Sequence, residues 1–487
     1  MLAKFYITTP LYYLNGNPHI GHASATIAAD VISRWHRMRG DDVFFVTGSD
    51  EHGEKNQKAA EQLKKDPQAY VDGLVETWKK AWGSLDISYD DFIRTSEKRH
   101  EAAVPDFLAR LKKAGDIYKG FYEGWYCVHD ETFITDTQLR DGKCPECGRA
   151  VTRVKEESYF FKLGRYQDLL LGLYAKNPSF LSPSYRADEV KNRVRGGLKD
   201  LSITRPSLVW GIPFPGDSKH TVYVWVEALL GYMTVLGWPG KGRFGEFWPA
   251  DVHLVGKEIN WFHTVIWPAM LMSADIPIPR KVFAHGWWTV DGKKMSKSVG
   301  NVIDPIKISK AYGVDAFRYF LIREKPLGED GDFSEAALKA RINGELVADL
   351  GNLVYRVLSL AERFDGNIEG TPELDKHLDI KRIDALMLEL DLFGALNEIW
   401  AFVREANRYV NEKEPWKLQG DALGNVLYNL LEACRVISIM IGPFMPSTSA
   451  KMRSQLGVGQ GYLKDCRFGK FDGKPKKGSY LFTKIEN

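Results

Sequence analysis

A strand, a helix and a second strand follow one another in the first fifty residues, and this order limits the possible folds more than any other feature. Lys4–Thr9 is a short β-rich run, and apolar residues recur at helical spacing from His19 to Arg39. Val43–Thr47 is a near-continuous apolar run, which is typical of a parallel strand buried on both faces. The alternation predicts a doubly wound, Rossmann-like α/β sheet.

The chain of 487 residues is too long for one ordinary core, and its character changes along the sequence. Residues 116–220 interrupt the α/β pattern with short aromatic strands such as Ser158–Leu163 and contain three of the five cysteines. The α/β pattern resumes at His220–Glu227 and Val252–Val255 and includes a helix around Trp261–Leu271. We therefore expect residues 1–115 and 221–335 to form two halves of one domain, separated by an insertion at 116–220.

The chain becomes helical after about residue 335. Three long amphipathic helices are predicted at Ala336–Leu360, Lys381–Glu414 and Gly420–Ile441. They indicate an all-α domain at 336–487. The basic tail Lys470–Lys477 is expected to be a solvated loop.

The composition limits the classes of partner. Subtracting 63 Asp and Glu from 66 Lys and Arg gives a net charge of +3, so any nucleic-acid role must depend on local patches. The most apolar stretch, Val436–Met445, is interrupted by Gly442 and Pro443 and is too short to span a bilayer, so no membrane partner is expected. Five cysteines imply no disulfide framework, which favours a cytoplasmic location.

The first chemical motif, Pro18–His22, lies at the start of the first predicted helix, where the common Walker and G-x-G-x-x-G loops are absent. It places two imidazoles, His19 and His22, at a helix N-terminus, which is a ready anion site. Gly21 between them allows a ring or a phosphate to approach the backbone. The alternative is that one histidine merely caps the helix.

The second motif is the lysine-rich run Asp291–Ser298. Lys294 and Lys297 are three residues apart on a loop that begins with glycine, which suits a mobile clamp on a triphosphate. A solvated turn is the alternative for this run alone.

Together the two motifs resemble the HIGH and KMSKS signatures of class I aminoacyl-tRNA synthetases. Further stretches resemble the methionyl-tRNA synthetase family over essentially the whole chain. These stretches are Tyr6–Tyr13, Thr47–Gly53, Tyr223–Ala228, Gly256–His263 with Trp267-Pro268, and Asn411 with Pro415-Trp416.

The resemblance implies that L-methionine is joined to ATP as methionyl-adenylate and then transferred to tRNA(Met), with release of AMP and diphosphate. Mg²⁺ would arrive with ATP. The alternatives are another class I synthetase, a HIGH-type nucleotidyltransferase without tRNA, and a non-catalytic tRNA-binding relative. An insertion of about a hundred residues is too small for the editing domain of the branched-chain enzymes.

The resemblance also assigns residues to roles. His19, His22, Lys294 and Lys297 would stabilise the transition state at the α-phosphate. Gly21, Gly256, Glu258, the backbone around Trp288, and Lys297 would bind ATP. Asp50 would bind the ammonium of methionine, and Leu229 departs from relatives that have proline there. The remaining residues of the expected methionine pocket are Leu11, Tyr13, Trp225, Ala228, Tyr232, Ile259, His263 and Trp267.

The insertion contains a candidate metal site. Cys144 and Cys147 form a C-x-x-C turn, and the spacing to Cys127 suits one tetrahedral Zn²⁺. Relatives often have cysteine where this sequence has Asp130, which is itself a permitted ligand. His129 could replace Asp130, and three thiols without a metal are the other alternative.

In the helical region, Asn352 and Arg356 are four residues apart and share one helix face. Trp416 follows Pro415 at a helix end. The resembling family reads the tRNA anticodon at these positions, by stacking and base-edge hydrogen bonds. A buried tryptophan in a capped helix is the alternative. A monomer is the default expectation.

Overall fold

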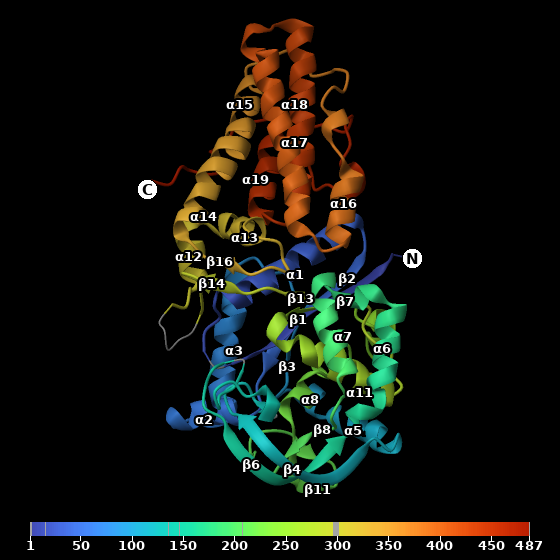
Figure 1. Cartoon of the computed structure of the whole chain (residues 1–487). Helices are drawn as coiled ribbons and strands as arrows, with labels where there is room; N and C mark the ends of the chain where they lie inside the picture. The colour runs from blue at the N-terminus through green and yellow to red at the C-terminus, as the bar shows by residue number, and fades with distance from the viewer. Residues whose placement is uncertain are drawn as a thin grey trace.

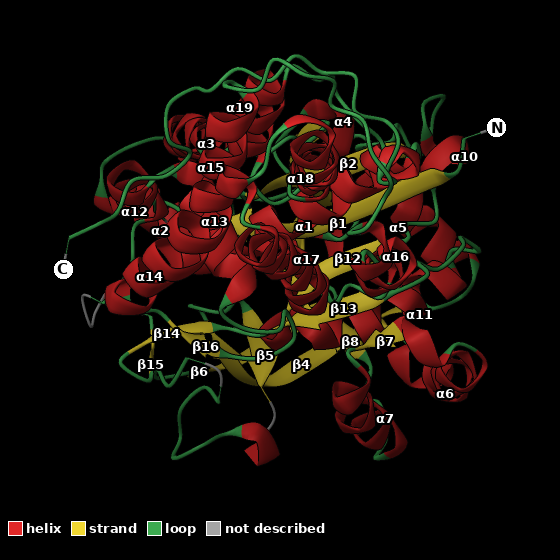
Figure 2. Cartoon of the chain, turned by 90° about the horizontal axis from the view of Figure 1, so that it is seen from above, coloured by secondary structure: helices red, strands yellow, loops and turns green. Residues whose placement is uncertain are grey.

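The computed structural model describes residues 2–14, 16–134, 136–145, 147–206, 208–295 and 301–486. Its centre is a six-stranded parallel sheet with the order β3-β2-β1-β12-β13-β7, and Figure 2 shows most of these strands side by side. The predicted doubly wound α/β fold is confirmed. The strands are β1 (Lys4–Tyr13), β2 (Asp42–Asp50), β3 (Asp91–Arg94), β7 (Leu181–Ser182), β12 (Val252–Gly256) and β13 (Val282–His285).

Successive residues of the central strands face two different hydrophobic cores. Phe45 packs into the core shared with the C-terminal helices, whereas Val46 packs into the core shared with the insertion. Leu254 and Val255 divide in the same way. Burial on both faces explains why β2 reads as a continuous apolar run rather than an alternating one.

The first helix, α1 (Ile20–Arg39), begins and ends where the sequence predicts. His19 is its N-cap, and Gly40 follows it with a φ of 97°, a conformation that favours glycine. Asp66 caps α3 (Pro67–Ser84) by accepting hydrogen bonds from two backbone N–H groups of the first turn. The other helices of the α/β region are α2 (Glu54–Gln62), α4 (Lys98–Glu101), α5 (Val104–Lys113), α8 (Val224–Ala228), α9 (Gly231–Thr234), α10 (Phe244–Phe247) and α11 (Trp267–Ser273).

The insertion forms the lower part of the molecule in Figure 1, around an antiparallel sheet with the order β5-β4-β6-β8. Smaller sheets have the orders β10-β11-β9 and β15-β14-β16. The strands are β4 (Ile117–Cys127), β5 (Thr132–Ile134), β6 (Thr152–Phe161), β8 (Leu201–Ser202), β9 (Thr204–Arg205), β10 (Pro213–Phe214), β11 (Asp217–Val222), β14 (Trp288–Val290), β15 (Lys293–Lys294) and β16 (Gly331–Asp332). Helices α6 (Gln167–Lys176) and α7 (Ala187–Arg195) also lie within residues 116–220, whereas strands β14 to β16 lie in the second half of the α/β region.

A bundle of long helices stands on the other side of the sheet (Figure 1). Its members are α14 (Glu335–Arg341), the π-helix η7 (Ile342–Gly351), α15 (Asn352–Ala361), α16 (Ile380–Leu388), α17 (Leu392–Lys413), α18 (Gly420–Met440) and α19 (Pro446–Leu456). Helices α12 (Pro305–Tyr312) and α13 (Val314–Arg323) join it to the sheet.

The bundle differs from its prediction in two places. The helix expected at Lys381–Glu414 is two helices, because Leu390 has a φ of 66° and the side chain of Asp391 caps the second helix. Ten residues of the helix expected at Ala336–Leu360 are π-helical. The domain boundaries at residues 116, 221 and 336 stay predictions.

One buried arginine connects the sheet layer to the bundle. Arg318 on α13 is fully buried and forms an ion pair of 2.6 Å with Asp30 on α1. Its guanidinium also donates to the carbonyls of Pro443 and Phe444, each at 3.0 Å, between α18 and α19. Among the described residues, no helix is long and apolar enough to cross a membrane.

Candidate active site

The strand order reverses direction between β1 and β12, and parallel α/β sheets bind ligands at the carboxyl ends of the strands at such a point. Pro18–His22 follows β1, and Gly256–Glu258 lies at the end of β12. Asp50 is the last residue of β2 and pairs with Tyr13 at the end of β1. The topology therefore places the nucleotide and amino-acid candidates at one edge of the sheet.

The two histidines form a reciprocal cap on α1. The Nδ1 of His19 accepts from the backbone N–H of Gly21 at 3.0 Å, and the Nδ1 of His22 accepts from the backbone N–H of His19 at 3.2 Å. Their rings stack with centroids 3.6 Å apart. An Nδ1 that accepts a hydrogen bond has no proton, so a neutral ring in this cap carries its proton on Nε2. Capping and a functional role are thus compatible rather than alternatives.

The start of the lysine-rich loop lies next to this cap. A Cβ atom added to Gly21 would meet the terminal methyl of Met295 at 3.9 Å. The backbone N–H of Ile20 donates to the carbonyl of Ile303, just after the loop, at 3.1 Å. Lys294 lies in β15, and Lys297 lies outside the described residues.

Two of the expected adenosine residues, Glu258 and Trp288, have hydrogen-bond partners nearby. The indole of Trp287 donates to the carboxylate of Glu258 at 2.6 Å, and the indole of Trp288 donates to Ser24 on α1 at 2.9 Å. A Cβ atom at Gly256 would lie 2.4 Å from the Glu258 carboxylate, so a larger residue here would require the Glu258 side chain to move.

Asp50 is 2% exposed, and its Oδ1 has no hydrogen-bond partner among the described residues. The hydroxyl of Tyr13 is likewise buried without a partner. Burial, with the nearby charges of Glu227 and Glu131, raises the pKa of Asp50 well above its ordinary value. Buried polar groups are normally paired, so this pair of orphaned oxygens marks a place for a cationic hydrogen-bond donor.

Several of the other methionine candidates touch one another. Tyr232 donates to the Nε2 of His263 at 2.8 Å, because the Nδ1 of His263 is occupied by the carbonyl of Ile259 at 3.0 Å. Burial lowers the pKa of His263 to about 4, so this ring is neutral. Trp225 meets Tyr13 edge-on, with centroids 6.0 Å apart.

The three other candidates for the methionine pocket are described by their packing and burial. Leu11 packs against Gly231 at the start of α9, and Ala228 is buried at the end of α8. Trp267 is fully buried, and its ring contacts are with Phe107 and Trp248.

Sequence reasoning missed a buried network beside Asp50. The two carboxylate oxygens of Glu227 are bonded by His52 at 2.8 Å and by His100 at 2.7 Å, and all three side chains are buried. The Nδ1 of His100 lies 3.1 Å from the hydroxyl of Thr234. His52 and Glu227 fall inside stretches that resembled the family, but nothing local in the sequence connects them to His100.

The metal candidates converge in the insertion. The ligand atoms of Cys127, Asp130, Cys144 and Cys147 all lie within 4.8 Å of one another. His129 instead bonds the other oxygen of Asp130 at 2.9 Å, so the structure favours Asp130 over His129 in the set. Tetrahedral Zn²⁺ with bonds of about 2.3 Å requires sulfur atoms about 3.8 Å apart, close to the 3.6 Å between Cys127 and Cys147.

The anticodon candidates lie on the bundle, away from this edge. Asn352 is exposed on α15, and Arg356 one turn later places its guanidinium 5.7 Å from the ring of Trp416. Trp416 follows α17 in η9 (Pro415–Lys417) and is 53% exposed. The alternative of a buried tryptophan is wrong.

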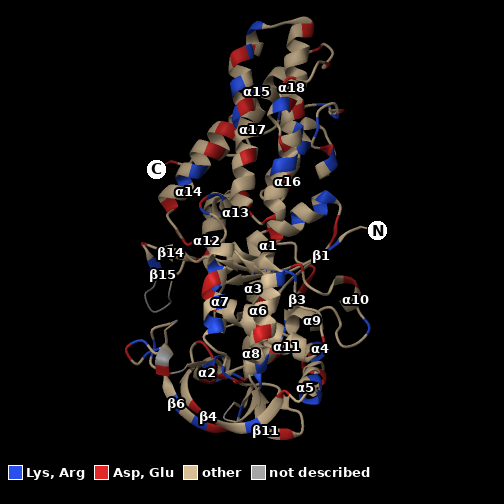
Figure 3. Ribbon diagram, turned by 45° about the vertical axis from the view of Figure 1, so that its right-hand side comes forward, with Lys and Arg blue, Asp and Glu red and all other residues tan. Residues whose placement is uncertain are grey.

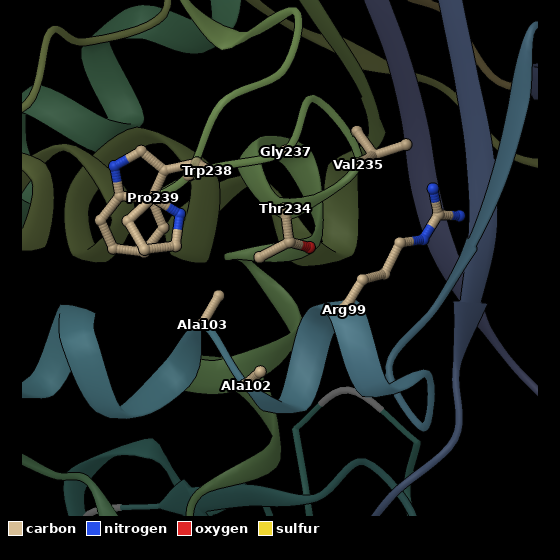
Figure 4. Close-up of a pocket in the computed structure, with 9 residues that line it drawn as sticks. Arg99, Ala102, Ala103, Thr234, Val235, Gly237, Trp238 and Pro239 are labelled. Carbon is tan, nitrogen blue, oxygen red and sulfur yellow. The ribbon is translucent and has the colours of Figure 1, made fainter.

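One cavity of about 280 Å³ lies between α4, α5 and the segment after α9 (Figure 4). Its one charged side chain, Arg99, directs its guanidinium to Asp91 in a two-point contact of 2.7 and 2.9 Å. A second cavity of about 330 Å³ lies between α2 and the cysteine cluster. Neither cavity contains the candidate catalytic residues.

Comparison with known proteins identifies the family of this chain. The family model described as tRNA synthetases class I (M) matches residues 5–156 and 149–358. Methionine–tRNA ligase of Caldanaerobacter subterraneus subsp. tengcongensis is 47% identical over 507 aligned residues, which cover 100% of this chain and 80% of that protein. The Thermotoga maritima methionine–tRNA ligase is 48% identical over 92% of this chain and 74% of its own length.

A solved structure of Mycobacterium tuberculosis methionyl-tRNA synthetase in complex with methionyl-adenylate superposes with a TM-score of 0.94 at 38% identity. The superposition covers 99% of this chain and 100% of that one. Sequence identity and fold agree over nearly the whole chain, and the family model agrees with both over residues 5–358, so the chain belongs to the methionine–tRNA ligase family of class I aminoacyl-tRNA synthetases.

Proposed function

We propose that this chain activates L-methionine with ATP and transfers it to tRNA(Met). The observation that supports this most directly is the edge where β1, β2 and β12 end. There the reciprocal cap of His19 and His22 and the unpartnered carboxylate of Asp50 follow adjacent strands. An anion site next to a site for a cation is what an amino acid and ATP require.

The reaction needs positioning and charge stabilisation rather than a protein nucleophile. The carboxylate of methionine attacks the α-phosphorus of ATP, and diphosphate leaves. The terminal ribose hydroxyl of tRNA then attacks the acyl carbon, and AMP leaves. We assign the Nε2–H donors of His19 and His22, together with Lys294 and Lys297, to the charge that develops on the phosphates.

Gly21, Gly256, Glu258 and the backbone of Trp288 are proposed to hold ATP, which brings Mg²⁺ with it. Asp50 is proposed to bind the ammonium of methionine, with the hydroxyl of Tyr13 next to it. The side chain is expected to lie among apolar and aromatic residues, as suits a thioether. These residues are Leu11, Trp225, Ala228, Tyr232, Ile259, His263 and Trp267.

We propose one structural Zn²⁺ on Cys127, Asp130, Cys144 and Cys147, a donor set that fits this ion. The ion would cross-link the end of β4 to the later turn that contains Cys144 and Cys147. Purified protein should contain about one zinc per chain, and Cys144→Ala should lose it and destabilise the insertion. Asp130→Cys should retain zinc, whereas His129→Ala should change its content little. Metal-free protein prepared without chelator would contradict the assignment.

Asn352, Arg356 and Trp416 are proposed to read the anticodon of tRNA(Met). A cytoplasmic location and a monomer complete the proposal. None of the five cysteines forms a disulfide, which suits a reducing compartment. Light scattering of the purified chain tests the monomer.

The decisive experiment is ATP–diphosphate exchange with each of the twenty amino acids in turn, followed by charging of tRNA(Met). Exchange should depend on methionine without tRNA. Preference for another amino acid would favour a different class I synthetase. Exchange without any tRNA charging would favour a nucleotidyltransferase.

A further inference from the structure

We propose that the C-terminal tail completes a phosphate-binding surface on the bundle, formed by Arg356, Arg363 and Lys477, which binds the sugar-phosphate backbone of the tRNA anticodon arm. We call these three residues the tail–α15 surface. The inference rests on the proposed function, because it requires that the bundle binds tRNA.

The tail is attached to the bundle through its backbone. The N–H of Lys476 donates to the carbonyl of Gln455 at 2.7 Å, and the side chain of Gln455 donates to the carbonyl of Ser479 at 2.9 Å. Farther along, Ile485 and Asn343 exchange two hydrogen bonds of 2.9 Å each. The expected loop is therefore held in place on both sides of Lys477.

An aromatic pair positions the Lys477 ammonium. Its Nζ lies 4.0 Å from the centroid of the Tyr355 ring on α15. Tyr480 stacks on Tyr355 with centroids 4.1 Å apart and an interplanar angle of 17°. The neighbouring Lys477 ammonium is the main reason that the pKa of Tyr355 is lowered. A cation held over a ring in this way needs less ordering when an anion binds.

The cations of this surface are not neutralised by the protein. In the part of the chain that the structure describes, no carboxylate lies within salt-bridge distance of Arg356, Arg363 or Lys477; Arg356 bonds instead to the amide of Asn411 at 3.2 Å. Elsewhere red and blue residues are largely mixed along the ribbon in Figure 3. A local excess of unpaired cations on a protein of net charge +3 is a site for a polyanion.

The position of the surface indicates which polyanion. The guanidinium of Arg356, a member of this surface, lies 5.7 Å from the centroid of the exposed Trp416 ring. A base stacked on Trp416 would bring its own backbone, with a charge at every nucleotide, toward Arg356 and the tail. Tyr355 and Arg356 are neighbours on α15, so the ring contacts of Lys477 and of Trp416 lie along one helix, which favours an RNA strand over an isolated phosphate.

The test is the salt dependence of binding between the full chain and a tRNA(Met) transcript. Removing one phosphate contact should lower the slope of log Kd against log salt by about 0.7–0.9. We expect this for Lys477→Ala, with methionine-dependent ATP–diphosphate exchange unchanged. Lys477→Arg should keep the wild-type slope. Lys484→Ala is the matched control, since it removes the same charge from the same tail at the residue before Ile485, which contacts Asn343.

Two results would overturn the inference. One is a wild-type slope in Lys477→Ala, and the other is an equal drop in Lys477→Arg, which would attribute the effect to packing. If Trp416→Ala still weakened tRNA binding in either case, the proposed function would stand without the tail. Failure of methionine-dependent exchange in the wild type would instead contradict the proposed function itself.

Discussion

The carboxyl edge of the sheet and the outer face of the bundle differ in how exposed their candidate residues are, as the proposed small-molecule and tRNA ligands would require. At the sheet edge, Asp50 is 2% exposed and is surrounded by carboxylates that already have partners. On the bundle, Trp416 is 53% exposed, and the guanidinium of Arg356 on α15 lies 5.7 Å from its ring. A small ligand can be enclosed, whereas a macromolecule must be met at the surface.

The two regions differ in the free-energy cost of burying charged groups. At the sheet edge, the fold buries Glu51, Glu131 and Glu227 but gives them Arg94, Tyr126 and two histidines as partners. Of these four carboxylates, Asp50 keeps one oxygen without a partner among the described residues, and the ammonium of a bound amino acid would supply that partner under the proposed function. The bundle face needs no such compensation because water solvates it.

The largest effect on stability should come from removing the buried ion pair that connects the sheet to the bundle. Arg318→Met leaves Asp30 buried with its main partner removed, which should lower the free energy of unfolding by about 3–5 kcal/mol. Urea denaturation measures this. Arg34→Met is the control, because Arg34 contacts the same carboxylate but is partly exposed. Equal small losses in both variants would show that the regions are connected by other contacts.

The next effect should be confined to the sheet edge. If Lys297 stabilises the transition state, Lys297→Ala should raise the activation free energy by about 3 kcal/mol, which is 100- to 1000-fold in rate. We expect ATP–diphosphate exchange to slow by this factor while methionine binding stays intact. Wild-type exchange would refute the assigned role.

The corresponding change on the bundle should be smaller and should leave the sheet edge untouched. Loss of base stacking in Trp416→Ala should weaken tRNA binding by about 1–3 kcal/mol, with exchange near the wild-type rate. Trp416→Phe retains a ring and should recover part of the loss. A parallel fall in exchange would mean that the regions are not independent.

The smallest expected effect is a pH dependence of stability that comes from His52 at the sheet edge and not from the bundle. Burial alone would lower the pKa of His52, but the Glu227 carboxylate outweighs it and raises that pKa above its ordinary value. Such a group stabilises the fold fully below about pH 6.5, its ordinary pKa, and loses that contribution as pH rises through the folded pKa, at about 1.4 kcal/mol per pKa unit.

Thermal unfolding across this pH range should therefore show an alkaline loss in the wild type. His52→Asn keeps a neutral donor toward Glu227 and should remove the loss. Trp416→Ala should leave it unchanged. An identical alkaline loss in His52→Asn would assign the titration to another group.

The two regions also differed in how far the sequence predicted them. The cap on α1, the burial of β2 and the i, i+4 relation of Asn352 and Arg356 follow from local rules, and the structure agrees with them. The division between α16 and α17 depends on the left-handed conformation of Leu390, which apolar spacing does not show.

At the sheet edge, the resemblance located Asp50 but not the Glu227 network, since His100 is brought to it only by tertiary packing. The four metal candidates could be found in the sequence because they form two short motifs, Cys127 with Asp130 and Cys144 with Cys147, each with the spacing of a metal-binding turn. The choice between Asp130 and His129 required the geometry.

The reciprocal histidine cap restricts which residues can occupy positions 19 and 22. Asparagine can reproduce the acceptor at Nδ1 but is too short to reach the place of Nε2, and glutamine reaches that place but cannot cap with the same atom. Serine or aspartate, the usual helix caps, would satisfy the backbone alone. If Nε2 faces the phosphates as proposed, imidazole meets both demands on one ring, and none of these alternatives does.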